Sequence, residues 1–254
     1  MTLILNEIHL LNGLKKTLLI AAADSRISKP DRTFDSLKRK VFRIRYFNGA
    51  VSYFGLACVY PKGRKQYLST WLPCFIRHQS TTDSLKSFAA NLRNELNEIV
   101  PRNILQKNPS GFHICGYESN GLPDFYYLSN CRLGGFDYVD LKPRYKPPSS
   151  HFLGRDASKV CNWDGKNPLS AENGILTYRH GDFRAHDAAW DLLDEILKKM
   201  FRYPDFKQPS SPREYKEYVK FKFEFIAFLY KKWADRKRIG RPIDVLLFES
   251  PKKN

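Results

Sequence analysis

The sequence predicts an α+β fold in which helices cover the outer faces of two stacked antiparallel sheets, a four-layer αββα sandwich. Strand-like runs come in pairs joined by short turns, and helical patterns follow them in separate blocks, an order typical of α+β proteins. With 254 residues, of which 42% are hydrophobic, the chain is long enough to bury the core of one large domain.

The first half of the chain is predicted to form hairpins. Residues 2–11 ("TLILNEIHLL") and 17–23 ("TLLIAAA") have the composition of strands, and "KVFRIRYF" and "GAVSYFGLA" form a second pair. An Asn-Gly dipeptide lies between the two strands of each pair, at 12–13 and at 48–49. Asn-Gly is a strong signal for a tight β-hairpin turn, so each pair is expected to be antiparallel.

A helix is predicted next, followed by a return to strands. In residues 85–99 the apolar side chains share one helical face, after a Ser/Thr/Asp start and before Pro101. "GFHICGYE" and "FYYLSN" then flank the turn "SNGLPD". The Pro-rich stretch at 142–150 ("KPRYKPPSS") is the best candidate for a linker.

Two helices and a strand complete the prediction. A second helix is expected from about Ala185 to Phe201, and a third opens at Ser211, where a cap residue, a Pro and a Glu occur in the order of a capping box. The inward residues predicted for the second helix are Leu192, Leu193, Ile196, Leu197 and Met200. The chain ends on the strand "PIDVLLFE".

The charge is strongly positive, with 43 Lys and Arg against 26 Asp and Glu, a net of +17. Residues 198–241 hold 14 Lys and Arg against five Asp and Glu, so this region suits a polyanion and nucleic acid stays among the possible partners. A buried helical stripe explains its aromatic residues better than base stacking, because they recur at steps of three and four. The predicted stripe is Tyr215, Val219, Phe223, Ile226, Tyr230 and Trp233.

Several other classes of function are not indicated. No apolar run approaches the roughly 18 residues of a membrane span, and the N-terminus lacks the pattern of a secretory signal, so we expect a soluble cytoplasmic protein. The five cysteines contain no C-x-x-C pair and are expected to be reduced. "RLGGFD" lacks the Lys-Ser/Thr of a phosphate loop. His180, Asp182, His186 and Asp187 are interpreted as polar residues of a helix start, so neither a metal nor a cofactor is predicted.

One strand ends in an unusual way. The uncharged run of residues 17–23 is followed directly by Asp24, Ser25 and Arg26. A strand that only filled the core would have no reason to deliver an acid and a base at its end. An ion pair at a hairpin end is the simplest explanation, and a catalytic site is the alternative.

The order of several segments favours the catalytic alternative. "AAADSR", "KVFRI", "AVSYFGLA", "FHICGYESNGLPDFYYLSN" and "IGRPIDVLLFE" follow one another as in a proteasome-type β subunit. The chain therefore resembles the N-terminal nucleophile (Ntn) hydrolases, and within them the bacterial proteasome-like peptidases. The resemblance implies a single Ntn-hydrolase-like domain over 1–254, with a variable insertion at about 132–183 and a long basic helix at about 212–236.

The resemblance also implies a catalytic set. Thr2 would be the nucleophile once Met1 is removed, Asp24 and Lys40 would lie beside it, and the Gly55 N–H would stabilise the oxyanion. A free α-amine titrates near 7.7–8, and a neighbouring Lys⁺ shifts it toward the neutral form that accepts a proton.

Supporting residues follow from the same resemblance. Arg26 is expected to shape the region around Asp24. The nearest match to the family's Gly-Ser-Gly turn is "LGRDASK", which supplies Asp156 and Ser158, and a further supporting acid would be Asp235.

Two hypotheses about function remain, with a weaker third. The first is a threonine peptidase subunit in a homo-oligomeric ring or spiral, acting on peptides or unfolded proteins, with an unfoldase as a possible partner. The second is a catalytically silent proteasome-like scaffold that retains Met1 and binds a protein or a polyanion. The third is a related amidase that cleaves a small amide.

Overall fold

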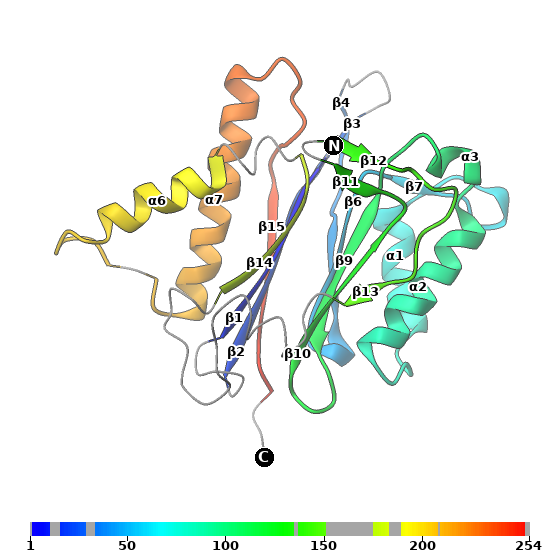
Figure 1. Cartoon of the computed structure of the whole chain (residues 1–254), viewed down its shortest axis with the longest axis horizontal. Coiled ribbons are helices and arrows are strands. Elements are labelled where there is room, and N and C mark those ends of the chain that lie inside the picture. The colour runs from blue at the N-terminus through cyan, green and yellow to red at the C-terminus, as the bar shows by residue number, and fades with distance from the viewer. Residues whose placement is uncertain are drawn as a thin grey trace.

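A computed structural model describes residues 2–10, 16–28, 34–134, 137–150, 175–182, 189–207 and 209–251. Two antiparallel sheets face each other in the middle of the molecule, and helices cover the outer face of each (Figure 1). This is the predicted αββα arrangement. The start of β1 (Leu3–Leu10) lies at one end of the two facing sheets, and the end of β15 (Ile243–Glu249) lies toward the other end.

The first sheet has four strands in the order β14-β1-β2-β15, and every neighbouring pair is antiparallel. All eight residues of β1 and all eight of β2 are buried, because helices cover one face of the sheet and the second sheet covers the other. This explains why these strands read as continuous runs rather than as alternating patterns. The strands are β1 (Leu3–Leu10), β2 (Thr17–Asp24), β14 (Ile175–Gly181) and β15 (Ile243–Glu249).

The second sheet has five strands in the order β13-β10-β9-β6-β5. The turn predicted at Asn48-Gly49 joins β5 to β6, with Asn48 in the left-handed conformation at the end of a short 3-10 helix, η1 (Arg45–Phe47). The strands are β5 (Val41–Ile44), β6 (Gly49–Phe54), β9 (Gly111–Tyr117), β10 (Pro123–Ser129) and β13 (Ser149–Ser150). The other predicted turn, at residues 12–13, lies outside the described residues.

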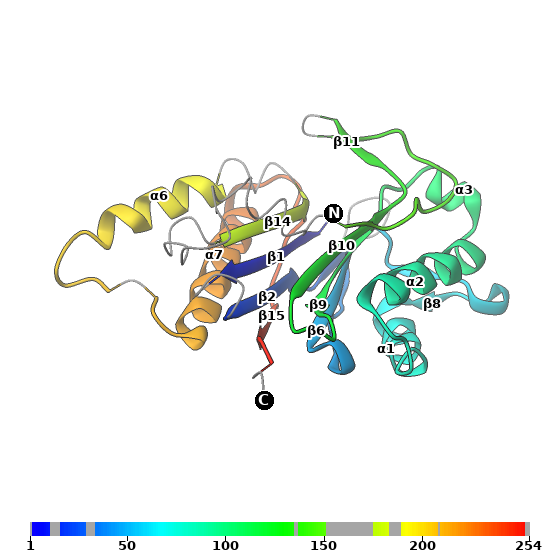
Figure 2. The same ribbon diagram turned by 60° about the horizontal axis from the view of Figure 1, so that its bottom comes forward.

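Four main helices form the outer layers. On the second sheet lie α1 (Leu68–His78) and α2 (Leu85–Ile99), and on the first lie α6 (Asp191–Met200) and α7 (Pro212–Trp233), as Figure 2 also shows. Ser84 caps α2 through the amide of Ser87, and Ser211 and Glu214 form the predicted capping box of α7. The sequence prediction missed α1, which has no side-chain cap and contains Pro73.

The remaining elements are short. Three two-stranded hairpins lie beside the main sheets: β3 (Arg26–Ser28) with β4 (Phe34–Leu37), β7 (Cys58–Val59) with β8 (Gln66–Tyr67), and β11 (Arg132–Gly134) with β12 (Asp137–Val139). A 3-10 helix, η2 (Pro61–Gly63), and a single-turn helix, α3 (Arg102–Leu105), complete the described elements. Among the described residues, no helix combines the length and the apolar composition that a bilayer span requires.

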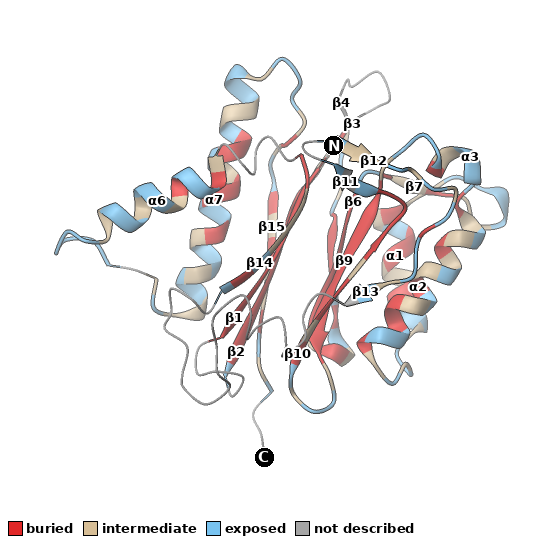
Figure 3. Ribbon diagram, viewed as in Figure 1, coloured by how far each residue is buried: buried red, intermediate tan, exposed pale blue. Residues whose placement is uncertain are grey.

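The buried side chains form three layers, one under each pair of helices and one between the sheets (Figure 3). In the layer under α7, Val219, Phe223 and Ile226 are buried as predicted. Trp233 is 73% exposed, so the prediction that it closes the stripe is wrong. It is the last residue of α7, where the helix extends past the sheet (Figure 1).

Two further sequence predictions need correction. In α6 only Leu193 is buried, whereas Leu192 and Ile196 are more than half exposed, because this helix contacts its neighbours along a narrow strip. The predicted linker at 142–150 is part of the domain: Tyr145 is buried under α2, and its hydroxyl shares a hydrogen bond of 2.8 Å with Ser110.

Candidate active site

The N-terminal end of β1 brings together three polar residues that are far apart in the sequence. Thr2 directly precedes β1, Asp24 is the last residue of β2, and Lys40 directly precedes β5 of the other sheet. Because β1 and β2 are antiparallel, the start of one lies beside the end of the other, whatever the length of the turn between them. All three residues are buried, and the side chains of Asp24 and Lys40 are 0% exposed.

The Lys40 ammonium group links the three residues. Its Nζ donates to Thr2 Oγ1 over 2.7 Å and to Asp24 Oδ1 over 3.2 Å, and also to the carbonyl oxygen of Arg26. A lysine nitrogen has three protons, so these partners use its full donor capacity. The ammonium group is therefore fixed against the hydroxyl of Thr2.

The Asp24 carboxylate accepts hydrogen bonds from three backbone N–H groups. Its Oδ1 accepts from Leu3 N at 2.9 Å, and its Oδ2 accepts from Arg26 N at 3.0 Å and from Gly240 N at 3.3 Å. This explains why the uncharged strand ends on an acid. The carboxylate ties the starts of β1 and β3 and the approach to β15 to a single point, and it balances the charge of Lys40.

Burial dominates the electrostatics of Lys40. Desolvation lowers the pKa of its ammonium group below the usual 10.5, and the nearby Arg26 charge lowers it further, while Asp24 opposes both effects. The Lys40 ammonium group donates to the Thr2 hydroxyl over 2.7 Å, so it can stabilise negative charge on Oγ1.

Gly55 follows β6, which is bound to the site through its backbone. Tyr53 N donates to the carbonyl oxygen of Lys40 over 3.1 Å. Gly55 has a φ of +85°, and a Cβ there would lie 1.9 Å from the carbonyl oxygen of Pro109, so this position requires glycine. Gly55 is thus the first residue after the strand that bonds to Lys40 through Tyr53, and its role toward an oxyanion stays a prediction.

An ion pair that the sequence interpretation missed, between buried Asp182 and partly buried Arg238, also contacts Thr2. Asp182 N donates to the carbonyl oxygen of Thr2 over 2.9 Å, and Asp182 Oδ2 pairs with Arg238 at 3.1 Å. The preceding residue, Gly181, has a φ of +121°, and a Cβ there would lie 1.6 Å from the same Thr2 oxygen. Asp182 is therefore part of the candidate site and not only a polar residue of a helix start. A Gly-Asp pair at a strand end was its one signal in the sequence.

The other predicted supporting residues have different outcomes. Arg26 does reach the site, through its amide and carbonyl groups. Asp235 is exposed on an open cavity of about 430 Å³ that Asp182 and Arg238 also line, and among the described residues it forms no hydrogen bond with Thr2, Asp24 or Lys40. Asp156 and Ser158 lie outside the described residues.

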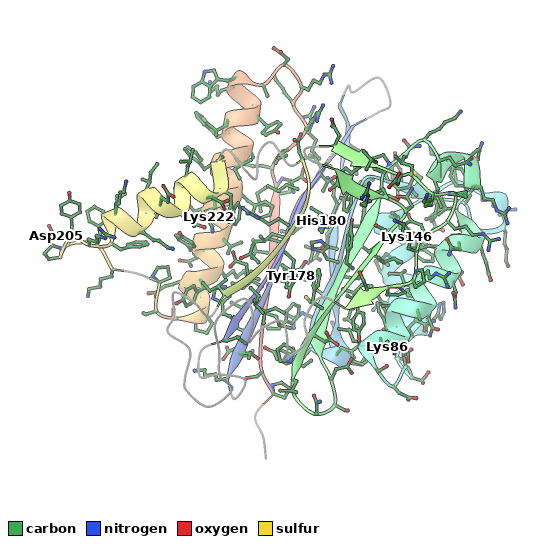
Figure 4. The ribbon with its side chains drawn as sticks, viewed as in Figure 1. Lys86, Lys146, Tyr178, His180, Asp205 and Lys222 are labelled. Atoms are coloured by element: carbon green, nitrogen blue, oxygen red, sulfur yellow. The ribbon has the colours of Figure 1, made fainter. Side chains whose placement is uncertain are left out.

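The side chain of His180 packs between the two sheets, against Tyr127 and His113. It lies on β14 beside Tyr178, as Figure 4 shows, and its ring stacks on Tyr127 with centroids 4.1 Å apart. Its Nδ1 lies 2.6 Å from Nε2 of His113, whose Nδ1 is 2.8 Å from the Asn6 side-chain oxygen. The predicted helix-start position of His180 is therefore wrong.

Sequence comparisons gave no relative: no family model matches the chain, and no curated protein matches it in sequence. Solved structures do resemble it. The Gly-1 mutant of Anbu from Hyphomicrobium sp. strain MC1 superposes with a TM-score of 0.46 at 12% identity, covering 98% of this chain and 82% of that chain. Anbu from Yersinia bercovieri, described as an ancestral beta-subunit, gives 0.45 at 11% identity, covering 97% and 81%. A further structure of Anbu from Hyphomicrobium sp. strain MC1 gives 0.45 at 11% identity, covering 97% and 82%. This similarity concerns the fold alone.

Proposed function

We propose that this chain is a threonine-type Ntn hydrolase that cleaves peptide bonds, with Thr2 as its nucleophile after removal of Met1. One observation carries the proposal: the hydroxyl of Thr2 accepts a 2.7 Å hydrogen bond from a fully buried lysine that is paired with a fully buried aspartate. A lysine and an aspartate that served only to join two hairpins would not need to contact the hydroxyl of Thr2.

The proposed reaction proceeds in two steps. Thr2 Oγ1 attacks the carbonyl carbon of the substrate, and its proton passes to the freed α-amine of Thr2, then to the departing amine of the substrate. This leaves an ester between Thr2 and the acyl half of the substrate. A water molecule then attacks the ester, gives a proton to the α-amine, and releases the acid and the restored hydroxyl.

Each buried group has a role in this scheme. Lys40⁺ favours the neutral, proton-accepting form of the α-amine and stabilises negative charge as it develops on Thr2 Oγ1. Asp24 holds the ammonium group in position. The backbone N–H of Gly55 is proposed to bind the oxyanion of the tetrahedral intermediate.

Substrate and assembly follow from the resemblance to proteasome-type β subunits. We infer peptides or unfolded proteins as substrates and a homo-oligomeric ring or spiral as the assembly. The positive charge attracts acidic substrates or partners by a force that salt screens.

A silent scaffold is the second candidate, and the chemistry of the α-nitrogen supports it. While Met1 is attached, the nitrogen of Thr2 belongs to an amide and cannot accept the hydroxyl proton. The residue is also only 5% exposed. In that case the polar cluster would serve stability alone.

The intact mass of the purified protein, before and after treatment with a threonine-reactive epoxyketone, separates the two candidates. The peptidase predicts the loss of one methionine and the gain of a single adduct, with no adduct on Thr2→Ala. A retained methionine and no adduct would reject the peptidase in favour of the scaffold.

A further inference from the structure

A second polar cluster lies at the opposite end of β1 from Thr2. Odd-numbered residues of this strand face α7, and two of them, Leu3 and Leu5, belong to the apolar layer there. The next two on the same face are Glu7 and His9, which are 5% and 2% exposed. An acid and an imidazole thus replace apolar side chains in a helix–sheet interface, where burial is costly unless they have polar partners.

Two further charged residues come from the helices. Lys222 lies on α7 behind α6, as Figure 4 shows, and its Nζ donates to both oxygens of Asp194 on α6, at 2.9 and 3.2 Å. The Tyr218 hydroxyl donates to Asp194 Oδ1 over 2.7 Å. The same ammonium group lies 4.0 Å from the centre of the Trp190 ring. Its contacts within the protein therefore satisfy Lys222.

The residues of β1 are satisfied only in part. Glu7 Oε2 and His9 Nε2 lie 2.8 Å apart. Glu7 Oε1 has Lys222 Nζ at 3.9 Å, which is an ion pair but is too long for a hydrogen bond. His9 Nδ1 is buried and has no hydrogen-bond partner among the described residues. In the neutral tautomer that carries its proton on Nε2 and donates it to Glu7, His9 Nδ1 presents a lone pair, and both unfilled positions are then acceptors.

The residues that carry these acceptors, Glu7 and His9, line a cavity of about 220 Å³. It is lined by Glu7, His9, Asp194, Tyr215, Tyr218 and Lys222, with Ile175, Phe201 and Pro209 among its apolar walls. The edge of the Tyr215 ring packs against His9, with centroids 4.8 Å apart. The cavity is smaller than the roughly 300–1,000 Å³ of sites for drug-sized ligands.

The charges around the cavity favour a cation. Lys222 and His9 hold the pKa of Glu7 below its usual value even though burial opposes this, so Glu7 is ionised at neutral pH. Two carboxylates then share one buried ammonium group, and Arg179 is already paired with Asp191 at 2.9 Å. The remaining cation of the lining, Lys198, is exposed.

We propose that this cavity binds a small organic ammonium ion with a short apolar or aromatic body. Its N–H groups would donate to His9 Nδ1 and Glu7 Oε1, and the tyrosine rings would pack on its body and on its charge. Among the described lining residues, an anion would meet two carboxylates and no unpaired buried donor. The inference is independent of the chemistry at Thr2.

Calorimetric titration of the full chain with three probes of one shape tests the proposal: benzylammonium, neutral benzyl alcohol and anionic benzoate. Saturable binding of benzylammonium is expected, with benzyl alcohol and benzoate at least tenfold weaker. Glu7→Gln should weaken benzylammonium binding by about tenfold or more, because it removes a buried charged acceptor. Glu98→Gln, on an exposed position of α2, should leave it unchanged, as should Thr2→Ala.

Three results would overturn the proposal. They are no saturable binding of benzylammonium at millimolar concentration, benzoate binding as tightly as benzylammonium, and equal binding to wild type and Glu7→Gln. If Glu7→Gln fails to fold, Tyr215→Leu replaces it, since it removes a partly exposed aromatic wall without altering a buried charge. Loss of benzylammonium affinity is then expected, and unchanged affinity would overturn the site.

Discussion

Replacement of Lys40 by methionine separates the structural from the chemical role of the buried pair. Lys40→Met keeps the length of the side chain but removes the ammonium group that balances Asp24. Loss of one partner from a buried ion pair typically costs about 3–5 kcal/mol. Three backbone N–H groups still bind the Asp24 carboxylate, so we expect the lower part of this range.

Urea unfolding measures this change in stability directly. For a chain of this size, about 3 kcal/mol corresponds to a fall in melting temperature of about 6–12 °C. In the double variant Lys40→Met with Asp24→Asn, no buried charge remains unpaired. Its loss of stability should be smaller than the sum of the two single losses, by at least about 1 kcal/mol.

Hydrolysis of a fluorogenic peptide amide gives the second measurement. We expect Lys40→Met to lose at least about 10²-fold in rate, because it removes the group that tunes the proton acceptor. The double variant should recover stability and stay inactive. If the unfolding free energy of Lys40→Met lies within about 1 kcal/mol of the wild-type value, the Lys40–Asp24 pair does not stabilise the fold as proposed. If Lys40→Met retains its hydrolysis rate, Lys40 has no part in the chemistry.

Three other substitutions test neighbouring parts of the account. Gly181→Ala should destabilise the protein by at least about 3 kcal/mol in urea unfolding, because its Cβ would collide with the carbonyl oxygen of Thr2. The control Gly121→Ala, at a φ of +77° with no atom near its Cβ, should cost only about 1 kcal/mol. Equal losses would show that backbone conformation alone matters. Arg238→Met should cost about 3 kcal/mol and slow hydrolysis, since it leaves a buried carboxylate unpaired. Arg213→Met should change stability by under about 1 kcal/mol, because the Arg213 side chain is 88% exposed. If Arg238→Met changes neither the stability nor the hydrolysis rate, the Asp182–Arg238 pair is not part of the site. The pKa of Glu7 is lowered from 4.5, so its ionised form stabilises the fold above pH 4.5. The difference in unfolding free energy between wild type and Glu7→Gln should therefore shrink as the pH falls below 4.5. A difference that does not change with pH would contradict an ionised Glu7 in the folded protein.

The fold was predictable because its signals are local. Runs without charge, Asn-Gly turns and capping residues are read over a few positions, and they located most of the main strands together with α2 and α7. The helix α1 was missed because Pro73 and an uncapped start weaken the same signals. Trp233 and the apolar residues of α6 were misplaced because periodicity shows which residues share a face but not how far the neighbouring layer extends.

The site was predictable only in part, for a similar reason. Asp24 gave a local signal, because an acid that ends an uncharged strand is unusual. Thr2 and Lys40 entered through the order of segments, and the structure brings both to Asp24. Asp182 and Arg238 lie 56 positions apart, and they meet because the end of β14 and the segment before β15 lie at the same end of the first sheet. Such pairs depend on strand order, which no local pattern in one sequence contains.

The most direct test of the central claim is to locate the epoxyketone adduct within the chain. After treatment and trypsin digestion, tandem mass spectrometry of the N-terminal peptide shows which residue begins the peptide and which residue carries the inhibitor. We expect a peptide that begins at Thr2 with the adduct on that threonine, and no adduct in Lys40→Met. A peptide that still begins with Met1, or an adduct on any other residue, would contradict it.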